Sequence, residues 1–220
     1  SNTTYDRSPY GNDGTLTNMN EGNDAVVNGT AWTSGKYGYG MKFDGIDSYI
    51  DVSHSGSLDL GEAGSQFSIS FWMKSLATAQ GTVISKWAGG ADPNPFIFYT
   101  QTGCISRKGT IAWWMHNSPG SGCDYNIVSS PNVNVTDGIW HYVVFTRNAG
   151  TLELYIDGSL DNTSSVSDLD FSSSADISIG RYRTGDVGTV FDGSIDEVRI
   201  YRRALAPEEI RTHYLRGSGH

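Results

Sequence analysis

The 220-residue chain is poor in several features, and each shortage excludes a class of protein. No run of 18 consecutive apolar residues occurs, so the sequence predicts no transmembrane helix and no membrane insertion. Lys and Arg number only 15 against 24 Asp and Glu, which gives a net charge of −9. That balance argues against nucleic acid or an anionic membrane surface as a partner.

Cysteine is also scarce, because Cys104 and Cys123 are the only two in the chain. They bracket a predicted hairpin, and we interpret them as one disulfide of an extracellular or cell-surface protein. Two reduced thiols are the alternative. A zinc site is disfavoured, since no Cys-x-x-Cys and no pair of His residues stands nearby.

The chain is rich in the residues of short strands and turns, with 27 Gly and many Asn, Ser, Thr and Asp. Alternating apolar residues predict ten strands. They cover residues 40–43, 49–52, 66–74, 81–87, 96–101, 110–117, 140–148, 151–156, 177–181 and 194–201. One short C-terminal helix is predicted at 207–214, because Pro207 suits the first helical position.

These elements show no βα alternation, which favours an all-β fold: an antiparallel two-sheet jelly-roll sandwich. We expect one domain over residues 1–215 and interpret 216–220 as the remnant of a tag. No signal peptide is visible, and we expect the chain to be a module of a larger secreted or surface protein.

Six different motifs follow one another along the chain: 12–16 (NDGTL), 43–52 (FDGIDSYIDV), 67–74 (FSISFWMK), 137–143 (DGIWHYV), 154–158 (LYIDG) and 191–201 (FDGSIDEVRIY). Together they resemble the LamG-like jelly-roll domains of the concanavalin A-like lectin/glucanase superfamily. In 191–201 the apolar alternation slips once, at Asp196-Glu197. The resemblance implies a concanavalin A-like sandwich, in which the face carrying Trp72, Tyr142 and Tyr155 is often concave and open to ligands.

The resemblance also implies a structural calcium ion that ties the N-terminal segment to the last strand. The ligands it implies are Asp6, Asn12, Asp44, the carbonyl of Gly45, and Asp196. Alternatively, the first three side chains form Asx-turns and Asp196 pairs with a nearby arginine.

Catalysis is disfavoured, although glucan hydrolases of the superfamily carry E-x-D-x-x-E or E-x-D-x-E on one strand. The chain has six Glu and none stands in such a pattern, while the lyase motifs of the fold are also missing. We interpret His141 as a structural histidine.

Sugar sites combine aromatic platforms with a few polar groups. The candidates are aromatic and polar residues, mostly outside the shared motifs: Trp87, Tyr99, Trp113, Trp114, His116, Arg181 and Tyr182. Adjacent strand residues point to opposite faces, so Trp113 and Trp114 are not expected to face one ligand together. The alternative is that these rings only close the core and the hairpin edge.

The interpretation that follows is a non-catalytic extracellular module that binds glycan or a cell-surface protein. A lyase or hydrolase with an atypical site is the first alternative, and a structural adhesin or spacer without a small ligand is the second.

The predicted calcium site has a direct test. We expect a chelator to lower the melting temperature and calcium to restore it, because a bound ion stabilises by about 2.7 kcal/mol at 100 times its Kd. Asp196→Ala is expected to abolish this response. A melting curve unchanged by chelator would contradict the site.

Overall fold

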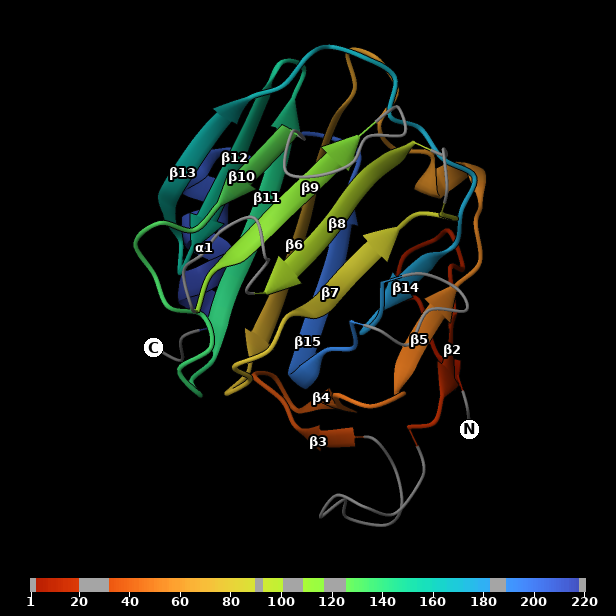
Figure 1. The fold of residues 1–220 in the computed structure, drawn as a ribbon, viewed down its shortest axis with the longest axis vertical. Coiled ribbons are helices and arrows are strands. Elements are labelled where there is room, and N and C mark those ends of the chain that lie inside the picture. The colour runs from red at the N-terminus through yellow and green to blue at the C-terminus, as the bar shows by residue number, and fades with distance from the viewer. Residues whose placement is uncertain are drawn as a thin grey trace.

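The computed structural model describes residues 3–19, 32–89, 93–100, 109–116, 126–182 and 189–217. They form two antiparallel sheets that lie face to face (Figure 1). The eight-stranded sheet has the order β1 (Thr3–Thr4), β2 (Gly14–Thr17), β5 (Tyr49–Val52), β14 (Ile177–Ile179), β7 (Gly81–Lys86), β8 (Asn94–Thr100), β9 (Ile111–His116) and β10 (Asn126–Ser129). The seven-stranded sheet has the order β13 (Ser159–Ser165), β12 (Thr151–Ile156), β11 (His141–Asn148), β6 (Gln66–Lys74), β15 (Asp192–Tyr201), β4 (Tyr39–Asp44) and β3 (Trp32–Ser34).

This arrangement confirms the predicted two-sheet jelly roll and all ten predicted strands. Sequence patterns missed β1, β2, β3, β10 and β13, which are short or, in β13, made almost wholly of polar residues. The motif segments 43–52 and 191–201 meet in the structure, because β15 pairs with β4 and Gly193 lies opposite Phe43. No helix in the described part of the chain is long and apolar enough to cross a membrane.

The core lies between the sheets and follows the predicted alternation along the central strands. On β6 the side chains of Phe67, Ile69, Phe71 and Met73 are all fully buried in it. Phe98 of β8 and Phe145 of β11 stack across the two sheets, with ring centroids 4.3 Å apart. The sheets are therefore joined by interdigitating rings, which carry much of the apolar area that folding removes from water.

A second cluster lies on the outer face of the seven-stranded sheet. Helix α1 (Pro207–Gly217) packs there. Ile210 belongs to the same cluster as Trp72, Tyr142 and Tyr155, and Tyr214 stacks on Trp72 with ring centroids 5.8 Å apart. The face that the resemblance implied to be open is thus largely covered, which corrects that expectation. The helix also continues past its predicted end at residue 214 into the segment interpreted as a tag remnant.

His141 is fixed between two carboxylates at one end of the seven-stranded sheet. Its Nδ1 lies 2.8 Å from Oδ2 of Asp157, and its Nε2 lies 3.1 Å from Oδ1 of Asp137. Burial disfavours the charged ring, but these two carboxylates outweigh burial and raise the pKa of His141. The ring bridges Asp157 and Asp137, as expected of a structural histidine.

Two further predictions fall wholly or partly outside the described residues. Cys104 and Cys123 are both in undescribed segments, so their disulfide stays a prediction. For His116 the structure describes the backbone in β9 and not the side chain.

The core position of Trp113 gives the first structural prediction. Trp113→Ala should lower the free energy of unfolding by about 3–5 kcal/mol, because it leaves a large cavity in the core. Urea unfolding measures this loss, with Trp114→Ala on the outer face as the matched control. A loss below about 1 kcal/mol would contradict the placement of Trp113 in the core.

The clamp on His141 predicts a pH-dependent stability. Because its pKa is raised in the folded chain, the stabilisation is complete below the unfolded value of about 6.5 and disappears as pH rises through the folded pKa. His141→Asn should cost roughly 1.5–3 kcal/mol at pH 6 and flatten this profile. Urea unfolding between about pH 5 and 9 checks both effects, and identical profiles for the two proteins would contradict the clamp.

Candidate functional site

Four aromatic side chains form a continuous strip on the outer face of the eight-stranded sheet. Ring centroids lie 4.9 Å apart for Trp87 and Tyr182, 5.7 Å for Tyr182 and Tyr99, and 5.2 Å for Tyr99 and Trp114. Three of the rings are half-buried, whereas Tyr99 is only 4% exposed. We call these four residues the aromatic strip.

The alternation of β8 and β9 explains why the strip faces outward. Phe98 pairs with Trp113 and both point into the core, while Ile97 pairs with Trp114 on the opposite face. Trp113 is fully buried and its Nε1 donates to the carbonyl of Pro95 at 3.0 Å. The two tryptophans thus point to opposite faces as predicted, and Trp113 is removed from the set of ligand candidates.

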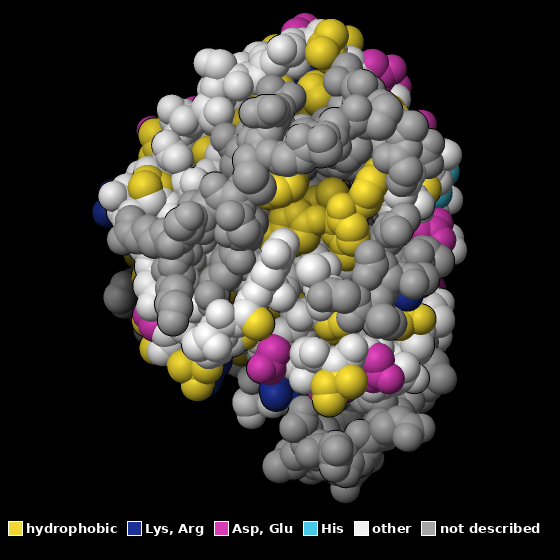
Figure 2. Space-filling view, viewed as in Figure 1, with side chains coloured by type: hydrophobic (Ala, Val, Ile, Leu, Met, Phe, Trp, Pro, Cys, Tyr) yellow, Lys and Arg dark blue, Asp and Glu magenta, His cyan; other side chains and the backbone are white. Residues whose placement is uncertain are grey.

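A hydrophobic hollow lies near the centre of this face, over β7 and β8. Figure 2 shows its apolar floor in the same view as Figure 1. Trp87 comes directly after β7 and Tyr182 follows β14, so the strip gathers residues from four neighbouring parts of the sheet. An apolar hollow with a few polar groups at its border is the usual form of a ligand site.

Arg181 lies beside the strip but is already engaged. Its guanidinium pairs with the carboxylate of Asp51, and its Cζ lies 3.4 Å from the ring centroid of Tyr49. The hydroxyl of Ser178 donates to the same carboxylate at 2.8 Å. Arg181 is only 5% exposed, and its contacts hold β5 beside the strip. The next residue, Tyr182, is itself a member of the strip.

The side chains of the predicted calcium ligands accept hydrogen bonds within the chain. Oδ1 of Asp44 accepts hydrogen bonds from the amides of Ile46, Asp47 and Ser48 and from the hydroxyl of Ser48. Burial on its own would raise the pKa of Asp44, but these hydrogen bonds outweigh burial, and the net effect is a lowered pKa. The side chain therefore closes its own turn, and Gly45, with φ of 72°, belongs to that turn.

The other three predicted ligands are also bonded within the chain. The carboxylate of Asp6 accepts from the amides of Ser8 and Asn12, and Asn12 Oδ1 accepts from the hydroxyl of Ser55. Asp6, Asn12 and Asp196 do line one cavity of about 810 Å³ between the sheets. Among the described residues, no three His, Cys, Asp or Glu side chains are grouped to hold a metal. Asp44 and Gly45 lie outside the lining of this cavity, and the calcium site stays a prediction.

No pair of carboxylates suited to glycoside cleavage was predicted, and the acidic groups near the candidate strands are committed to other contacts. Oε2 of Glu153 accepts from the hydroxyl of Thr146 at 3.1 Å and from that of Tyr155 at 3.0 Å. His141 likewise lies between the carboxylates of Asp157 and Asp137. Glu153 and His141 therefore both have partners within the fold.

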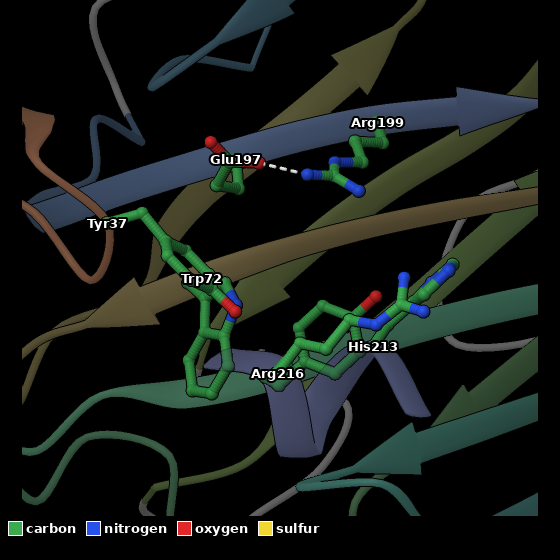
Figure 3. A pocket seen from close by; sticks show the side chains of 7 residues that line it. Tyr37, Trp72, Glu197, Arg199, His213 and Arg216 are labelled. Atoms are coloured by element: carbon green, nitrogen blue, oxygen red, sulfur yellow. Dashed lines mark hydrogen bonds and ion pairs between the residues drawn. The ribbon is translucent and has the colours of Figure 1, made fainter. Parts of the chain in front are cut away.

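A second hollow, which sequence reasoning missed, lies on the outer face of the seven-stranded sheet beside α1. It is lined by Tyr37, Trp72, Tyr142, Glu197, Arg199, His213 and Arg216 (Figure 3). These residues come from five separate segments, so no local motif marks them. The one signal in the sequence was the slip in alternation at Asp196-Glu197.

Comparison with known proteins identifies the fold. No curated protein sequence matches the chain. The receptor-binding domain of botulinum neurotoxin mosaic serotype C/D is 21% identical with a TM-score of 0.66, covering 96% of this chain and 47% of that one. The binding domain of Paraclostridial Mosquitocidal Protein 1 is 16% identical with a TM-score of 0.67, covering 96% and 51%. The chain thus spans about half the length of these toxin chains.

A third similar structure has a closer match in length. Domain 4 of an extracellular arabinanase from Geobacillus stearothermophilus, solved in complex with arabinotriose, is 21% identical with a TM-score of 0.62, covering 90% of this chain and 86% of that one. Identities this low establish likeness of fold alone. A family profile, however, matches residues 44–211 and spans both sheets. The chain therefore belongs to the Laminin_G_3 family of the concanavalin A-like lectin/glucanase superfamily, as its motifs predicted.

Proposed function

We propose that the chain is a non-catalytic, extracellular recognition module that binds a glycan on the aromatic strip. The observation that carries this proposal is the unbroken contact of four rings on the outer face of the eight-stranded sheet. The equivalent aromatic face of the other sheet lies largely under α1.

The chemistry of the strip suits a sugar. Rings stack on the apolar face of a pyranose or furanose, while indole N–H and phenol O–H groups bond its hydroxyls. Tyr99 is deep and its neighbours are half-buried, so ligand contact falls mainly on Trp114 at one end and on Trp87 and Tyr182 at the other.

The similar structures support this class of function. One is a domain of an extracellular arabinanase in complex with arabinotriose, and others are receptor-binding or binding domains of toxins. A module of a larger secreted protein that recognises carbohydrate or a cell-surface receptor fits both groups. Calcium is a separate, secondary proposal, supported by the shared cavity of Asp6, Asn12 and Asp196 and tested by the melting experiment in chelator.

Substitutions at the two ends of the strip test the proposal. Trp114→Ala and Tyr182→Ala should each weaken glycan binding by about 1–3 kcal/mol, by analogy with base–aromatic stacking, which is about 5- to 150-fold in Kd. Stability should fall by only about 0.5–1.5 kcal/mol through the lost ring contact. A glycan array selects the ligand, and calorimetry with that ligand measures the change.

The matched control is Tyr39→Ala, which removes a ring 75% exposed on the other sheet and should leave binding unchanged. Equal affinity of the wild type and both strip variants would overturn the strip as the site. A wild-type chain that binds no glycan on the array would favour the spacer or a protein partner.

A further inference from the structure

The second hollow, beside α1, has the dimensions of a small ligand site. Its volume is about 300 Å³, at the lower end of the usual range for ligand pockets. Figure 3 shows Tyr37 and Trp72 on one side, Glu197 and Arg199 on β15 along another, and His213 and Arg216 from α1 opposite them. The aromatic strip lies on the other sheet, so the two hollows are separate.

The floor of the hollow is aromatic. Trp72 and Tyr142 lie with ring centroids 5.1 Å apart and planes inclined by 36°. They are 2% and 4% exposed, because α1 and the neighbouring side chains cover the rest of each ring. Burial raises the pKa of Tyr142 to about 12, so its hydroxyl stays protonated. Tyr214 stacks on Trp72 and Lys36 lies over the same ring, so the two rings close the floor of the hollow and leave little of their own surface to a ligand.

The rim carries excess positive charge in a chain whose net charge is −9. Arg199 pairs with Glu197 through its Nη2 nitrogen, and a guanidinium has further N–H groups that can also bind a ligand. Arg216 forms no ion pair with any described carboxylate, and the Nζ of Lys36 lies 4.5 Å from the ring centroid of Trp72. Two cations therefore remain for an anionic group, and a guanidinium binds a carboxylate through paired hydrogen bonds.

His213 supplies an unused polar atom. Its Nδ1 is buried and has no hydrogen-bond partner among the described residues. Burial, helped by Arg199 and Arg216, lowers the pKa of His213 despite the opposing charge of Glu209. A buried polar atom without a partner costs free energy, and a ligand hydroxyl in the hollow would satisfy it.

A β-bulge directs Arg199 into this hollow. Asp196 lies opposite Trp72 and Arg199 opposite Ser70, so three steps on β15 match two on β6. Without the extra residue, Arg199 would point into the core. The extra residue strains Glu197, whose φ is 51°. Asp196 fixes the bulge by accepting from the amides of Tyr37 and Glu197, both at 2.8 Å.

We propose that this hollow is a second binding site, selective for a sugar that bears a carboxylate. Trp72 and Tyr142 form the closed floor beneath the sugar, Arg216 and Arg199 hold the carboxylate, and His213 and Glu197 bond hydroxyls. The site does not depend on the aromatic strip, and the module would hold two sugar units on opposite faces.

Nuclear magnetic resonance titration of the full chain tests the site with three probes: glucuronate, glucose and inorganic sulfate. Glucuronate should shift the signals of the Trp72 indole and of His213 in a saturable way. Glucose lacks the charge and sulfate lacks the ring, so both should bind at least about tenfold more weakly, the worth of one charge-assisted hydrogen bond.

Variants locate the binding and separate the two proposals. Arg216→Gln and Arg199→Gln should each weaken glucuronate about tenfold, and Glu197→Gln should tighten it by freeing Arg199. Arg211→Gln, on the same helix and outside the lining, is the matched control and should change nothing. Trp114→Ala should also leave glucuronate binding intact, whatever it does to glycan binding on the strip.

Three outcomes would overturn the proposal. Glucuronate that gives no saturable shift at Trp72 and His213 rules out the site. Equal affinity for glucose or for sulfate removes its selectivity for an acidic sugar. Glucuronate binding unchanged by both arginine variants places the anion elsewhere.

Discussion

The packing of aromatic rings between the two sheets is the interaction on which the rest of the structure depends. Phe98 and Phe145 stack across the core, and Trp113 contacts both rings from the side. Because strands alternate with a period of two, fixing these rings inward also fixes which residues point outward. Tyr99 and Trp114 face out of one sheet, and Trp72 and Tyr142 face out of the other. The candidate sites are thus a consequence of how the core is filled.

The two outer faces differ because the C-terminal segment covers only one of them. Ser68 connects that segment to β6: its hydroxyl donates to the carbonyl of Arg203 at 2.9 Å and accepts from the amide of Leu205 at 3.0 Å. Nη1 and Nη2 of Arg203 then donate to the two carboxylate oxygens of Glu209 in the first turn of α1. The helix is held over the aromatic face by these contacts, and the hollow lies between it and β15.

The sequence was sufficient for the fold and for part of the strip. Central strands such as β6 and β11 alternate strictly, so their ranges and core faces were predictable. Strands β1 and β13 were not, since a two-residue strand and a polar edge strand carry no apolar pattern. Trp87 and Tyr182 were found because they stand outside the family motifs. The hollow beside α1 was missed because tertiary packing alone brings Tyr37, Arg199 and His213 together.

Helix α1 also has a consequence for solubility. It covers Trp72, Tyr142 and Tyr155 on the outer face of the seven-stranded sheet. A chain cut before Pro207 would keep both sheets and their shared core, yet it would present these rings to water as one contiguous apolar patch. Patches of that kind promote self-association. The helix thus shields these rings from water, and a boundary for recombinant expression or domain transfer belongs after Gly217.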